Sequence, residues 1–120
     1  MDKILRSMMM KDVSDLKVDV NQAVELLNKK EAVLLDVRYP FETEKWGMRF
    51  AVEIPLNEIP DKKDRLPRDK IVLCACPHEF RSNIACQYLL TQSFNAKVLV
   101  GGLAALVDKL RGGAAKDLVL

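Results

Sequence analysis

Runs of apolar residues recur along this chain between polar segments. Two of them, 32–36 (AVLLD) and 71–75 (IVLCA), are apolar at almost every position, and two others, 51–54 and 97–100, are shorter or mixed. Continuous apolar runs of this length are typical of strands that are covered on both faces, as in parallel sheets. The pattern therefore predicts four buried strands.

The segments between these strands predict helices and turns. Apolar residues at helical spacing predict helices at 20–30, 81–93 and 103–110, the first with Asp19 as its N-cap. The glycine pair at 101–102 predicts a tight turn before the last helix. The inward face of the second helix is predicted from its apolar residues, which are Ile84, Ala85, Tyr88 and Leu89.

Two polar connections complete the pattern. Prolines and charged residues predict a loop with one helical turn at 38–50 and a solvated connection with a short helix at 57–69. Apolar strands that alternate with helices predict an α/β fold, with a mostly parallel central sheet and helices on both faces. We predict one domain at 15–113, between an N-terminal arm (1–14) and a C-terminal tail (114–120).

Composition and charge exclude several functional classes. The chain has 120 residues, enough for one self-sufficient core, with a net charge of +2 and 6% aromatic residues. Scattered basic residues and few aromatics argue against nucleic-acid binding, and we expect no membrane partner because no stretch has the length and apolarity of a span. Three cysteines do not make a disulfide framework, which favours a reducing, cytoplasmic location. A monomer and a homodimer through Met8–Met10 or 118–120 are both compatible with the sequence.

The candidate chemistry lies in CACPHEFRS, residues 74–82, between a predicted strand and a predicted helix. A loop in this position points several backbone N–H groups into one concavity beside the positive end of the helix dipole, which favours anions. The same groups stabilise the thiolate of a cysteine at the start of the loop, which is Cys76. Arg81 closes the loop with a fixed positive charge. We therefore predict a nucleophilic Cys76 in an anion-binding loop.

The other thiols and the single histidine have simpler interpretations. Cys74, at the end of a strand, and Cys86, within a helix, are interpreted as small buried hydrophobes. His78 is expected to be an exposed loop side chain, although its position also allows it to help hold a thiolate. No metal is expected, because C-x-C-x-H lacks a convincing fourth zinc ligand. A Cys74–Cys76 disulfide is disfavoured, because residues i and i+2 of a strand lie about 6.6 Å apart.

These residues resemble the rhodanese family of sulfurtransferases over most of the chain. Landmarks of the family occur in the expected order, and they are VLLDVR (33–38), the acid Glu42, AVEIP (51–55), CPHEFRS (76–82) and VGGL (100–103). The resemblance implies a rhodanese-like three-layer domain, with a mostly parallel central sheet that is flanked by helices on both faces.

The resemblance also implies a mechanism. The Cys76 thiolate attacks a sulfane sulfur, becomes a persulfide and passes the sulfur on. A small sulfane-sulfur donor and a thiol or protein sulfur acceptor are the implied partners, with no cofactor. The loop that binds the persulfide comprises Pro77, His78, Glu79, Phe80, Arg81 and Ser82. Asp36, Arg38 and Glu42 are implied as support for the pocket, and the sequence leaves open whether Cys74 or Cys86 resolves the persulfide as an internal disulfide.

The loop departs from the family in ways that affect the donor. It contains no glycine, Pro77 has no N–H to donate, and Glu79 places negative charge where a dianion such as thiosulfate would approach. We therefore expect weak thiosulfate activity and favour a polysulfide, a small-molecule persulfide or a protein thiol. Phe80 is expected either to form a hydrophobic lip for the donor or to pack under the loop.

The sequence leaves two further alternatives. Arg81 either steers an anionic donor or braces the loop by pairing with Asp36 or Glu42. A non-catalytic rhodanese-like module that binds a partner or senses redox state is the alternative to a sulfurtransferase. Phosphoryl transfer is disfavoured, because the related phosphatases carry a longer loop than the four residues between Cys76 and Arg81.

Overall fold

A single parallel sheet forms the centre of the protein. The computed structural model describes residues 13–120, so the predicted arm before residue 13, with Met8–Met10, lies outside the described residues. The strands are β1 (Lys17–Val18), β2 (Ala32–Asp36), β3 (Ala51–Glu53), β4 (Ile71–Ala75) and β5 (Asn95–Leu99). They lie in the order β1-β5-β4-β2-β3, and every neighbouring pair is parallel.

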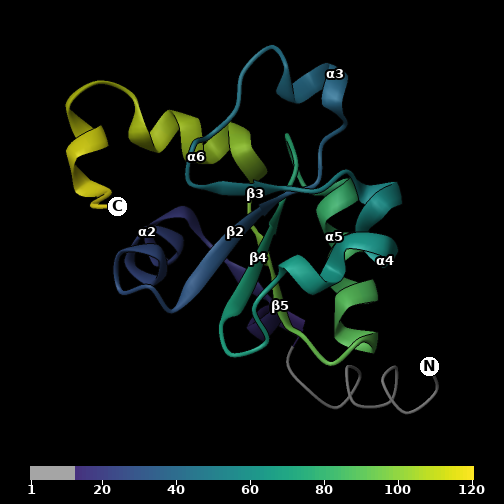
Figure 1. The fold of residues 1–120 in the computed structure, drawn as a ribbon. Helices are drawn as coiled ribbons and strands as arrows, with labels where there is room; N and C mark the ends of the chain where they lie inside the picture. Colours follow the sequence, from purple (N-terminus) through teal and green to yellow (C-terminus); the bar gives the residue numbers. More distant parts are fainter. Residues whose placement is uncertain (1–12) are drawn as a thin grey trace.

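Helices cover both faces of this sheet. They are α2 (Val20–Asn28), α3 (Pro40–Thr43), α4 (Ile59–Lys62), α5 (Phe80–Thr91) and α6 (Gly102–Leu110), with short 3-10 helices η1 (Val13–Leu16), η2 (Leu56–Glu58), η3 (Lys63–Arg65) and η4 (Gly112–Asp117). Figure 1 shows α2 and α6 on one side and α4 and α5 on the other, and each side has its own apolar core. The predicted three-layer α/β fold is confirmed. No helix within residues 13–120 is long and apolar enough to cross a membrane.

The strongest sequence patterns gave accurate elements. β2 and β4 have the predicted bounds, whereas β5 begins at Asn95 and β1 was not predicted at all. One side-chain orientation was wrong, because Ile84 on α5 is 46% exposed rather than inward. The inward positions are Ser82, Ala85, Cys86 and Leu89, which have helical spacing too, and Ser82 is drawn inward by its bonds to the loop.

The end of the chain packs back on the domain. Leu118 packs against the core on the α2 and α6 side. The Asn28 side chain donates from Nδ2 to the carbonyl oxygen of Asp117 at 2.9 Å, and its Oδ1 accepts from the Val119 N–H at 2.8 Å. These contacts tie the segment that we assign as a tail to the end of α2.

The start of α6 lies directly against the loop that follows β4. The N–H of Leu103 donates to the carbonyl oxygen of Cys76 at 2.7 Å, and the N–H of Ala104 donates to that of Pro77 at 3.2 Å. Gly102 has a φ of +66°, and a Cβ built on it would lie 2.0 Å from the carbonyl oxygen of His78. This close approach of two backbones therefore requires glycine at 102.

Gly102→Ala is expected to destabilise the protein, because the added methyl group meets three carbonyl oxygens of the loop in a backbone conformation that L residues avoid. We expect the free energy of unfolding to fall by roughly 2 kcal/mol or more. Chemical denaturation measures this. Gly113→Ala is the matched control, since nothing lies within 4 Å of its Cβ position and its φ is not positive. Equal stability of the two variants would contradict the close packing of α6 on the loop.

Candidate active site

Cys76 is the first residue after β4 and lies at the N-terminus of α5. Its Sγ accepts from the backbone N–H of Ser82 at 3.4 Å and lies 3.6 Å from Ser82 Oγ. The Ser82 hydroxyl donates in turn to the carbonyl oxygen of Glu79 at 3.0 Å. The thiol is 2% exposed, so the loop encloses it almost completely. Backbone and hydroxyl groups of the loop therefore fix the position of the sulfur.

Several backbone N–H groups of the loop have no acceptor among the described residues. Within residues 13–120, the backbone N–H groups of residues 78–81 donate no hydrogen bond to another protein group. These groups belong to the loop and to the first turn of α5, where a helix leaves its N–H groups free. Donors of this kind stabilise negative charge beside the Cys76 sulfur.

Arg81 is held by Glu42. Its two terminal nitrogens donate to the two carboxylate oxygens at 2.5 and 2.9 Å. Glu42 Oε1 also accepts from the N–H of Tyr39 at 3.0 Å, and the guanidinium lies over the Tyr39 ring at 5.4 Å. These bonds, led by the one from Arg81, lower the pKa of Glu42 to about 2. Of the two carboxylates considered for Arg81, the structure selects Glu42, and the pair ties α5 to α3.

Asp36 forms a separate, buried pair with Arg38. Arg38 donates from Nε and Nη2 at 3.0 and 2.7 Å, and both side chains are at most 2% exposed. The Arg38 guanidinium also donates to the carbonyl oxygen of Trp46 at 3.2 Å and lies 3.9 Å from the centre of its ring. Asp36 lies opposite Ala75 in the sheet, one residue before Cys76. The pair therefore supports the floor of the loop and contacts the segment that leads to β3.

Glu79 turns toward α6 and β1. One carboxylate oxygen accepts from the N–H of Gly101 at 3.1 Å, and the other lies 3.8 Å from Lys17 Nζ. Its charge is therefore offset by two partners, so its repulsion of a dianion is weaker than the sequence predicted. Sequence reasoning missed Lys17 and Gly101 as partners, because no local pattern connects residues so far apart in the chain.

The remaining loop side chains face outward. Phe80 is 77% exposed, which excludes the packed-under alternative and leaves a hydrophobic lip. His78 is exposed as predicted.

Cys74 and Cys86 are free and buried, also as predicted. Within residues 13–120, no group of three or more His, Cys, Asp and Glu side chains could hold a metal ion.

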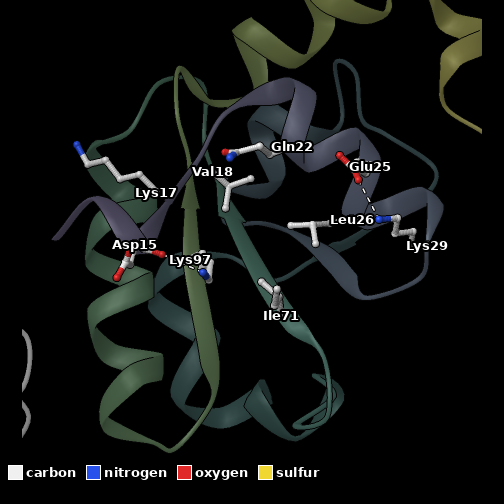
Figure 2. Close-up of a pocket in the computed structure, with 9 residues that line it drawn as sticks. All are labelled: Asp15, Lys17, Val18, Gln22, Glu25, Leu26, Lys29, Ile71 and Lys97. Atoms are coloured by element: carbon white, nitrogen blue, oxygen red, sulfur yellow. Dashed lines mark hydrogen bonds and ion pairs between the residues drawn. The ribbon is translucent and has the colours of Figure 1, made fainter. Parts of the chain in front are cut away.

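A hollow of about 380 Å³ lies elsewhere, over the sheet between α2 and β5 (Figure 2). Its lining contains Lys29, which pairs with Glu25, and Lys97, which donates to the carbonyl oxygen of Asp15. Its third lysine, Lys17, pairs with Glu79, and none of the three cysteines lines the hollow. The candidate nucleophile, Cys76, therefore lies in the loop and not in this hollow.

Comparisons with known proteins agree on one family. The sequence profile described as "Rhodanese-like domain" matches residues 19–109, which include the loop and both supporting ion pairs. The chain is 31% identical to a sulfurtransferase from Allochromatium vinosum, over 67% of this chain and 76% of the relative. It is 30% identical to the thiosulfate sulfurtransferase GlpE of Vibrio cholerae, over 72% and 82% of the two chains. A solved rhodanese-related protein from Thermoplasma volcanium is 29% identical, with a TM-score of 0.69 over 78% of this chain and 91% of that one.

Glu42→Gln is expected to lower the free energy of unfolding by about 1 kcal/mol at neutral pH, because it removes the ion pair with Arg81. The pKa of Glu42 is lowered, so the pair contributes fully above the ordinary pKa of a glutamate and its contribution is lost as the pH falls toward about 2. Unfolding measured against pH should show the wild type and the variant converging in that acidic window.

The matched control is Glu25→Gln, which removes a carboxylate from a fully exposed pair with Lys29. Little change in stability is expected there. If the two variants behave alike, the Arg81 pair does not brace the loop.

Proposed function

The chain belongs to the rhodanese-like domain family, and we propose that it is a sulfurtransferase in which Cys76 carries sulfane sulfur as a persulfide. The observation that carries the proposal is the contact of Cys76 Sγ with the Ser82 N–H at the N-terminus of α5, 3.4 Å away. Free N–H groups of residues 78–81 lie in the same loop. A thiolate or persulfide is the anion that such a site suits.

The proposed reaction has two steps. The Cys76 thiolate first attacks the sulfane sulfur of the donor, and the bond from that sulfur to the rest of the donor breaks, with its electron pair leaving on the donor remnant. An acceptor thiolate then attacks the outer sulfur of the persulfide, and Cys76 leaves as a thiolate. The N–H groups of residues 78–82 hold the negative charge of the outer sulfur between the two steps.

The charges around the loop favour a donor that is not a small dianion. Arg81 already holds Glu42 through two hydrogen bonds, and Arg38 holds Asp36. A dianion such as thiosulfate would have to displace a carboxylate to gain a guanidinium partner. Phe80, the first residue of α5, instead offers an exposed apolar surface in the loop. We therefore propose a polysulfide, a small-molecule persulfide or a protein persulfide as the donor, with weak activity toward thiosulfate.

The wild-type protein, incubated with excess polysulfide, is expected to carry one added sulfur on Cys76 that a reductant removes, because Cys76 becomes a persulfide. Cys76→Ser should gain none, and thiosulfate should load the wild type at least roughly tenfold more slowly than polysulfide does. Intact mass spectrometry measures both. Cys86→Ser, which changes another thiol, is the matched control and should still take up sulfur.

Two outcomes would count against this reading. Sulfur uptake that survives in Cys76→Ser would move the chemistry to another residue. No uptake from either donor, with Cys76 reduced and reactive in the unfolded chain, would favour the alternative, a non-catalytic module that binds a partner or senses redox state.

A further inference from the structure

Two buried thiols lie under the Cys76 site and have no part in sulfur transfer as proposed above. Cys74 is 0% exposed and Cys86 is 2% exposed, and both belong to the same apolar core as Cys76. Neither is in a disulfide. Cys74 has no exposed surface, so any reaction it has must come through a neighbouring group of the protein.

The register of β4 and α5 places these thiols opposite each other. Cys74 and Cys76 lie two residues apart and face α5, while Leu73 and Ala75 face the other core. Two strand residues span about 6.6 Å, and four helix residues span about 6 Å. Cys76 contacts Ser82. From this contact, Cys86 lies four residues further along α5 and Cys74 lies two residues back along β4, so the two distances are similar. Cys86 therefore lies at the level of Cys74.

The electrostatics agree with this placement. Interaction with the neighbouring Cys86 thiol, followed by burial, raises the pKa of Cys74. The same interaction lowers the pKa of Cys86, against the effect of burial and with help from Lys97. Cys74 also lies within the electrostatic influence of Cys76. Cys74 is thus the middle member of a column of three sulfurs, with Cys76 at the loop and Cys86 in α5.

We propose that the Cys74–Cys86 pair is an internal dithiol that reduces the Cys76 persulfide and releases its outer sulfur as sulfide. The Cys74 thiol passes its proton to the neighbouring Cys86 thiolate, and the Cys74 sulfur attacks Cys76 Sγ. The persulfide S–S bond breaks, and the outer sulfur leaves as hydrosulfide, which takes the proton from Cys86. The Cys86 thiolate then attacks Cys74 Sγ and displaces the Cys76 thiolate, which leaves a Cys74–Cys86 disulfide. This inference rests on the proposed function, since it requires the Cys76 persulfide.

The reaction is balanced without an added oxidant. One persulfide and two thiols become one thiol, one disulfide and hydrogen sulfide, so the two thiols supply the two electrons that reduce the sulfane sulfur. The first exchange joins residues i and i+2, whose spacing of about 6.6 Å is at the upper end of the disulfide range. Cys76 lies just outside β4, which ends at Ala75, so the strand does not hold that spacing fixed. An external dithiol resets the pair by the reverse exchange through Cys76.

The test uses the full reduced chain without oxygen and one equivalent of polysulfide sulfane sulfur. We expect the wild type to release about one sulfide per chain and to lose two titratable thiols. Cys74→Ala and Cys86→Ala should retain the sulfur on Cys76 and release roughly tenfold less sulfide. Trypsin places Cys74 and Cys76 in peptide 71–81 and Cys86 in peptide 82–97. Fragmentation of the linked peptides between Cys74 and Cys76 identifies which of the two is joined to Cys86.

Three results decide the outcome. A wild-type persulfide that persists with its other thiols intact overturns the inference and leaves the proposed function standing. Equal sulfide release and peptide linkage in Cys76→Ser also overturn it, because polysulfide then oxidises the pair directly. No sulfur uptake by Cys86→Ala or by a second variant, Cys86→Ser, with wild-type circular dichroism, removes the proposed function and the inference with it.

Discussion

The loop at Cys76 is held between the N-termini of two helices, and the rest of the site depends on this arrangement. The amides of Leu103 and Ala104 at the start of α6 bind carbonyl oxygens of the loop, while an amide of α5 binds the Cys76 sulfur. Peptide carbonyl and N–H groups point in opposite directions. The carbonyl of Pro77, fixed toward α6, therefore turns the N–H of His78 away from α6, where it is left for an anion.

The two arginines hold this arrangement in place, and they are not the main source of positive potential at the loop. Arg81 and Arg38 each satisfy a carboxylate in two hydrogen bonds, and the Arg38 pair is buried. A buried pair contributes position more than stability, because the desolvation of two charges offsets their attraction. Negative charge on the sulfur is therefore met mainly by backbone dipoles. Such dipoles suit a single negative charge at one point and give no extra attraction to a second charge.

The sequence predicted those parts of the fold that local pattern determines. β2 and β4 are apolar at nearly every position, so their bounds followed directly, and the loop between β4 and α5 followed from them. β1 has only two residues and is stabilised by pairing with β5, so no local pattern could predict it. The partner of Arg81 was also beyond the sequence, because Asp36 and Glu42 were equally plausible until Arg38 was found to occupy Asp36.

The absence of glycine from the loop also has a structural explanation. Glu79 has a φ of −138°, which any L residue adopts, so this position does not require glycine. Its carbonyl oxygen accepts from the Ser82 hydroxyl and from the backbone and side chain of Asn83. Its carboxylate bonds to Gly101, so the side chain leaves the pocket and adds a link to α6. Glycine is required at the neighbouring Gly102, where the two backbones approach too closely for any side chain.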